Sequence, residues 1–165
     1  MDSNGSITVT GGETYVSGPT SGGDGALDYD GEATITGGIF IAAGSTQMAQ
    51  NFGENSTQGS MLVNTDSCGE ITIKNSNGDV LASFTPTKTY ACVVISCPGI
   101  TAGETYTVTS GNSSTEVEMT SLIYGSGGMG GPGGMGNGDM GNGDMNNNGM
   151  GDPGGGNMQG GPQMR

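Results

Sequence analysis

The residues most capable of chemistry are carboxylates in the stretch GDGALDYDGEATITGG, residues 23–38. Asp24, Asp28, Asp30 and Glu32 all occupy even-numbered positions, and no lysine or arginine lies near them. Alternate residues of an extended strand point to one side, so on a single strand these oxygens would form an acidic ladder. Carboxylate and carbonyl oxygens are the ligands that calcium prefers. Two interpretations stay open: a calcium site that uses two or three of these side chains, or a solvated acidic face with aspartates in turns.

Two aromatic residues, Tyr15 and Tyr29, are candidates for carbohydrate binding. A phenol ring offers an apolar face that can stack on a sugar ring, and its hydroxyl can form hydrogen bonds. This role requires both rings to face outward. The competing interpretation is that both rings pack inside the fold.

The charge of the chain argues against several classes of partner. Lys and Arg total 3 against 16 acidic residues, which gives a formal net charge of -13. Nucleic acid and anionic membrane surfaces both need a basic footprint, so neither is an expected partner. No apolar run is long enough to insert into a membrane. If the ligand is an acidic polymer, a divalent cation such as calcium has to bridge the two.

The residue types also argue against catalysis. The chain has no histidine, so it cannot build a Ser-His-Asp or Cys-His site. A polysaccharide lyase needs a basic side chain to remove a proton, and only Lys74, Lys88 and Arg165 are basic. None of these lies beside the acidic run in the sequence. A hydrolase needs two placed carboxylates, but nothing in the sequence marks a cleft. We therefore expect no enzyme.

The first region, residues 1–58, contains a repeat. SITVTGGETYVSG (6–18) aligns with EATITGGIFIAAG (32–44), so that the two Gly-Gly pairs coincide. Each unit reads as a short strand, a Gly-Gly corner and a second strand. Such a repeat is typical of a solenoid, and we expect the last coils of a right-handed parallel β-helix. The interior of the stack should then hold Ile7, Val9, Ile35, Ile39 and Ile41. An antiparallel meander is the alternative.

The second region, residues 59–124, reads as an antiparallel β module that caps the solenoid. Short β-branched runs alternate with turn signals, and Asn77-Gly78-Asp79 is a strong hairpin signal. The third region, residues 125–165, is a low-complexity tail rich in Gly, Met and Asn, for which we expect disorder. The fold class is therefore all-β.

The cysteines are Cys68, Cys92 and Cys97. Their odd number leaves at least one thiol without an intramolecular partner. Cys92 and Cys97 would face opposite sides of one strand, so they should not pair there. We expect small apolar core residues, with one disulfide at most.

Several segments together resemble a known family. GALDYDGEATITGG, FIAAGS, MAQNFG, STQGSMLVN, GDVLASFTPTKTYACVVISCPGITAGETYTV and the Gly/Met-rich end are similar to the C-terminal part of bacterial secreted carbohydrate-binding domain-containing proteins. The resemblance implies a pectate-lyase-like right-handed β-helix at the cell surface. It implies non-catalytic binding of plant cell-wall polysaccharide, such as polygalacturonate or a cellulose-like glycan, with calcium on the helix. Relatives in this family carry more coils upstream.

Two alternatives to polysaccharide binding stay open. One is a structural or adhesive surface protein that binds no sugar specifically, and the other is a fragment of a polysaccharide lyase. The sequence begins inside what reads as a repeat, so we expect a piece of a longer secreted protein. An uncovered first coil exposes unpaired strand edges, which predicts self-association through the open end of the β-helix.

Overall fold

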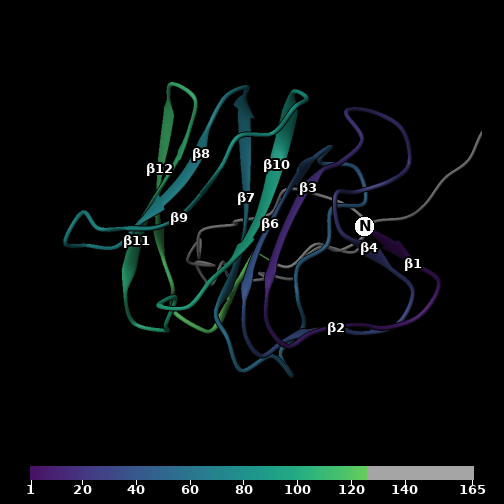
Figure 1. Cartoon of the computed structure of the whole chain (residues 1–165), viewed down its shortest axis with the longest axis horizontal. Coiled ribbons are helices and arrows are strands. Elements are labelled where there is room, and N and C mark those ends of the chain that lie inside the picture. Colours follow the sequence, from purple (N-terminus) through teal and green to yellow (C-terminus); the bar gives the residue numbers. More distant parts are fainter. Residues whose placement is uncertain (126–165) are drawn as a thin grey trace, which may run out of the picture. The chain divides into compact units, whose positions relative to one another are not determined.

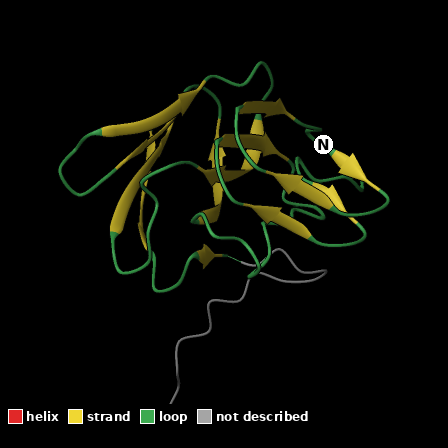
Figure 2. Ribbon diagram, turned by 60° about the horizontal axis from the view of Figure 1, so that its bottom comes forward, coloured by secondary structure: helices red, strands yellow, loops and turns green. Residues whose placement is uncertain are grey.

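The structure, a computed structural model, describes residues 1–125, except for the side chains at positions 66 and 67. This range lies within one compact unit and contains strands but no helix (Figure 2). The expected all-β class is confirmed. It follows that no described segment is a helix able to cross a membrane. The strands are β1 (Asp2–Ser3), β2 (Ile7–Val9), β3 (Glu13–Ser17), β4 (Asp28–Tyr29), β5 (Ala33–Ile35), β6 (Ile39–Gly44), β7 (Ser60–Ser67), β8 (Ile71–Lys74), β9 (Val80–Phe84), β10 (Tyr90–Ser96), β11 (Thr105–Ser110), β12 (Ser113–Glu118) and β13 (Ile123–Tyr124).

The two sequence repeats lie side by side in parallel. β1 pairs with β4, β2 with β5 and β3 with β6, and each pair joins equivalent positions of the two repeats. Ile7 therefore lies beside Ala33, and Glu13 lies beside Ile39. The repeat alignment is confirmed, and the repeats do not form an antiparallel meander. The sheets in this region are open rather than closed around an axis.

A five-stranded sheet joins the repeats to the following region. Its order is β13-β7-β10-β6-β3. β10 runs antiparallel to its neighbours β7 and β6 (Figure 1). β10 thus lies between β6, which belongs to the second repeat, and β7, which follows β6 in the sequence. The expected boundary between residues 58 and 59 falls just before β7, inside the stretch of chain that builds this sheet. That the two parts are separate modules stays a prediction.

The remaining strands form a four-stranded antiparallel sheet in the order β12-β11-β8-β9. The predicted hairpin between β8 and β9 is confirmed. The amide of Gly78 donates to the carbonyl of Asn75 at 3.0 Å, and Gly78 has a φ of 86°. Glycine adopts this left-handed conformation without the strain that a Cβ would add. The expected antiparallel pairing within residues 59–124 is therefore present in this sheet and between β7 and β10, whereas β13 pairs with β7 in parallel.

Two apolar clusters lie on opposite faces of the five-stranded sheet. One fills the space between the two sheets and includes Ile41, and the other lies under the repeats and includes Ile35 and Phe40. β6 is an interior strand of this sheet and is buried on both faces, which explains its continuous apolar sequence IFIAAG. The prediction that Ile39 and Ile41 pack inside the repeat stack is wrong. Both face the other cluster, because alternate residues of β6 point to opposite sides.

Cys92 is buried in β10 and Cys97 is buried just after it, and neither forms a disulfide. Burial raises the pKa of Cys92 to about 12 and that of Cys97 to about 11. Both therefore serve as small apolar core residues, as expected. The predicted tail at residues 125–165 lies outside the described residues except for Gly125.

Candidate functional site

The acidic run does not form one strand. Asp24 lies in an exposed loop, and only Asp28 belongs to the two-residue strand β4. The chain then bends at Gly31, whose amide donates to the carbonyl of Gly5 at 3.0 Å. This close contact fixes the corner between β4 and β5, and it places Asp30 and Glu32 on exposed positions beside it. The predicted four-carboxylate ladder on a single strand is therefore wrong.

The parallel register places a different acidic neighbour next to β4. Asp2 of β1 lies directly beside Asp28 of β4. Among the side chains that the structure describes, no three Asp, Glu, Cys or His residues converge as a group that could hold a metal ion. Calcium binding by Asp24, Asp28, Asp30 and Glu32 stays a prediction.

The two tyrosines lie on different sides of the five-stranded sheet. Tyr15 is aligned with Ile41, so it faces the four-stranded sheet, where its ring stacks on Phe84 at a centroid distance of 5.2 Å. Tyr15 remains 41% exposed, and its hydroxyl donates to Glu13 at 3.3 Å. Tyr29 instead packs against the cluster under the repeats. The two rings do not form a common platform.

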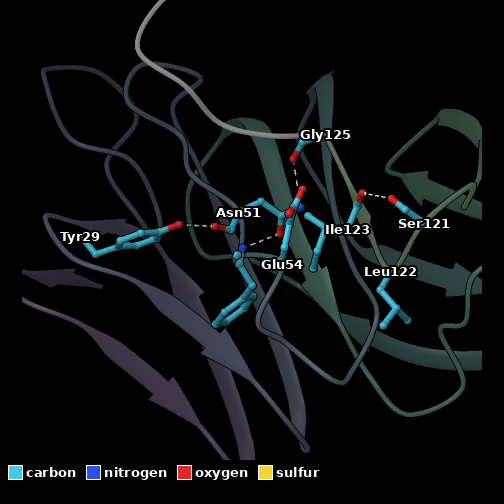
Figure 3. Close-up of a pocket in the computed structure, with 9 residues that line it drawn as sticks. Tyr29, Asn51, Glu54, Ser121, Leu122, Ile123 and Gly125 are labelled. Atoms are coloured by element: carbon cyan, nitrogen blue, oxygen red, sulfur yellow. Dashed lines mark hydrogen bonds between the residues drawn. The ribbon is translucent and has the colours of Figure 1, made fainter.

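Tyr29 lines two hollows that share part of their walls. Two hollows, with volumes of about 600 and 340 Å³, share Tyr29, Gly53 and Glu54 in their walls. The hollows are lined from three segments, residues 29–34, 51–55 and 121–125, and we call them together the Tyr29 groove. The Tyr29 hydroxyl points toward Asn51 along one side of the larger hollow (Figure 3).

Hydrogen bonds to the backbone of β4 and β5 hold Gln50 and the second segment of the groove in place. The Gln50 side chain forms the two hydrogen bonds with the Tyr29 backbone that a neighbouring strand would form. It accepts from the Tyr29 amide at 2.7 Å and donates to the Tyr29 carbonyl at 3.2 Å. The amide of Gly53 donates to the carbonyl of Ala33 at 2.7 Å. These contacts thereby hold residues 51–55 against residues 29–34.

Asn51 fixes the third segment of the groove. Its side-chain nitrogen donates to the carbonyls of Tyr124 at 2.8 Å and Gly125 at 3.0 Å. Its side-chain oxygen accepts from the Phe52 amide at 2.8 Å and from the Ser60 hydroxyl at 2.5 Å. Asn51 is only 3% exposed, and all of the usual hydrogen-bonding positions of its amide are occupied. It thus ties the second segment of the groove to a part of the chain that lies far along the sequence.

The groove combines an aromatic ring with acidic and neutral polar groups. Tyr29 is half-buried, and burial raises the pKa of its hydroxyl. The hydroxyl therefore remains protonated at neutral pH and donates to the Asn51 carbonyl at 2.5 Å. Glu32 and Glu54 line the smaller hollow, and Asn55 donates to Glu32 at 3.4 Å. No lysine or arginine is among the described residues that line either hollow.

Most of this groove was not predicted from the sequence. Of the six predicted site residues, only Tyr29 and Glu32 line it, while Tyr15, Asp24, Asp28 and Asp30 lie elsewhere. The segments around Asn51 and Leu122 carried no recognisable site motif. Asn51 lies in MAQNFG, one of the segments that carry the family resemblance, but its burial and its four hydrogen bonds become visible only in the structure.

Comparisons with known proteins do not extend this picture. No protein-family model matches the chain, and neither a curated protein nor a solved structure was found to match it.

Proposed function

We propose that this protein binds plant cell-wall polysaccharide in the Tyr29 groove without cleaving it. The observation that carries the proposal is an aromatic ring in the shared wall of two hollows, flanked by carboxylates and amides. Sugar rings are recognised by stacking on an aromatic face together with hydrogen bonds to polar groups at its edges. The resemblance of the sequence to secreted carbohydrate-binding proteins supports the same class of ligand.

The fold that presents the groove is, in this proposal, the end of a right-handed parallel β-helix. Three parallel strand pairs share one offset along the sequence, as successive coils of such a helix do. Parallel strands joined by a crossover are right-handed in nearly all known proteins. β-helices present long lateral surfaces, which suit an extended polymer better than a small molecule. A location at the cell surface, reached by secretion, is consistent with such a ligand.

A binding role without catalysis is supported by the residues around the groove. A lyase requires a base near the sugar, whereas Lys74 belongs to β8 and Lys88 to the connection between β9 and β10. Neither lines the groove. Glu32 and Glu54 line the same hollow, and a pair of carboxylates is what a hydrolase would need. A reducing-sugar assay on the same samples therefore accompanies the binding test, and we expect no product.

Charge in the groove governs which polysaccharide is preferred. Glu32 and Glu54 repel a polyuronate unless a cation lies between them, whereas a neutral cellulose-like chain needs no such cation. Calcium remains part of the proposal as an ion shared with an acidic glycan. Binding to polygalacturonate should then require calcium, and binding to a soluble cello-oligosaccharide should not.

Isothermal titration with each glycan, in calcium and in EDTA, tests the proposal. Tyr29→Ala should weaken binding by about 5- to 30-fold, since stacking on an aromatic ring contributes on the order of 1–2 kcal/mol. Tyr15→Ala is the matched control, because it removes the same ring from the opposite side of the sheet. Absence of binding to both glycans would instead favour the structural or adhesive surface role.

A further inference from the structure

The first repeat forms an end of the strand stack that is open. β1 and β2 each pair with one strand only, and β3 lies at the edge of the five-stranded sheet. The apolar residues at this end are incompletely covered: Ile7 and Val9 are half-buried, whereas Ala33 and Ile35, which lie beside them in the second repeat, are fully buried.

The opposite side of the second repeat is covered. β10 pairs with the free side of β6. The amides of Gly53 and Thr57 donate to carbonyls of β5 at 2.7 and 3.1 Å. Within residues 1–125, the stack of repeats is therefore covered at one end by the chain itself and open at the other.

Glycines of the second repeat show what the stacking of a coil requires. A Cβ on Gly37 would lie 2.9 Å from the Thr10 carbonyl oxygen, and a Cβ on Gly31 would lie 3.0 Å from the backbone of Gly5. Neither glycine has a positive φ, so close approach of the preceding repeat is what excludes a side chain there. These contacts run in one direction, from the second repeat toward the first.

The first repeat carries glycines at the equivalent positions, yet nothing approaches them closely. Gly11 is the equivalent of Gly37, and a Cβ on Gly11 would meet no atom within 4 Å. Gly5 is the equivalent of Gly31, and a Cβ there would meet only the Ser3 hydroxyl at 3.8 Å. Gly5 and Gly11 also lack a positive φ. Nothing in the described structure therefore requires glycine at these two positions.

We infer that the edge formed by β1, β2 and β3 is a docking surface for a further coil of the same repeat pattern, lying parallel to the first repeat. The carbonyls of such a coil would approach Gly5 and Gly11 as those of the first repeat approach Gly31 and Gly37. A second copy of the chain in head-to-head contact would run antiparallel to this edge and would not reproduce that register.

The test adds a coil to the existing protein. A tandem chain with a duplicate of residues 1–26 placed before Met1 keeps the offset between successive repeats. In the original chain, Gly11→Ala should leave the melting temperature unchanged or slightly higher, because the site is open. In the tandem chain, the same substitution should lower the melting temperature by about 2–4 °C, as a steric clash of on the order of 1 kcal/mol does in a domain of this size.

Gly37→Ala is the matched control and should destabilise both chains, because the first repeat already covers that position. Amide exchange gives a second readout that does not depend on a variant: protection of β2 and β3 should rise when the coil is added. The inference would be overturned if Gly11→Ala lowered the melting temperature of neither chain. It would also be overturned if the native chain formed a dimer through this edge and the added coil left the stability unchanged.

Discussion

Replacement of Asn51 offers the sharpest test of how the groove is held together. Its side chain makes two donor contacts to the carbonyls of Tyr124 and Gly125 and two acceptor contacts from Phe52 and Ser60. Asn51→Ala removes all four contacts at once. The consequences differ between the two sides, because Ser60 is fully buried, whereas Tyr124 is 38% exposed and its neighbourhood can admit water.

The magnitude follows from that difference. A buried donor left without an acceptor costs about 1–3 kcal/mol, whereas a carbonyl that regains water costs little. With two buried donors orphaned in Asn51→Ala, those of Phe52 and Ser60, the free energy of unfolding should fall by about 3 kcal/mol. That is a large part of the ~5–15 kcal/mol that holds a typical domain together.

Asn51→Asp separates the two sides of the interaction. The carboxylate keeps the acceptor for Phe52 and Ser60, but it places negative charge against the carbonyls of Tyr124 and Gly125. Burial without a cation should raise the pKa of the new carboxyl above its unfolded value. The variant should therefore be least stable at neutral pH and recover stability as the pH falls through that raised pKa, because the folded state then binds the proton more tightly.

Urea unfolding followed by circular dichroism measures both variants. Asn55→Ala is the control, because Asn55 is exposed and makes a single 3.4 Å contact with Glu32. It should cost less than about 0.5 kcal/mol. If Asn51→Ala were no more destabilising than Asn55→Ala, the reasoning that Asn51 organises the groove would be refuted.

Two other predictions concern buried thiols and glycines. Because burial raises the pKa of Cys92 to about 12 and of Cys97 to about 11, against 9.0 when unfolded, the unfolded thiols ionise first. The urea concentration at the unfolding midpoint should therefore be constant below about pH 8 and fall above about pH 9. In the double variant Cys92→Ala and Cys97→Ala, this fall should be smaller. Gly78→Ala meets no atom within 4 Å but has a φ of 86°, so it should cost about 1 kcal/mol in thermal unfolding. Gly59→Ala, whose Cβ would lie 2.5 Å from the Ile100 carbonyl oxygen, should cost about 3 kcal/mol, and equal effects would contradict this distinction.

The strands were largely predictable because their signals are local. Alternating β-branched runs and turn residues located the β8–β9 hairpin, and the Gly-Gly corners aligned the two repeats in the observed register. The insertion of β10 between β6 and β7 was not predictable in the same way. Pairing of distant strands depends on which edges remain open after the rest has folded, and no local pattern encodes that.

The candidate site was less predictable for the same reason. Asn51 bonds to Tyr124, which lies far from it in the sequence, so the groove exists only after the later part of the chain has returned to the second repeat. The ladder predicted for the acidic run was wrong because alternate residues share a face only on one continuous strand. The bend at Gly31 breaks that strand, and its cause is contact with Gly5 of the other repeat.

The most direct test of the central claim is to map the binding surface by nuclear magnetic resonance. A ¹⁵N-labelled chain would be titrated with a soluble cello-oligosaccharide, and with oligogalacturonate in the presence of calcium. The account predicts shift changes that saturate and that cluster in residues 29–34, 51–55 and 121–125, with Tyr15 unaffected. Saturable changes centred on Tyr15 and β3, or no change with either sugar, would contradict it.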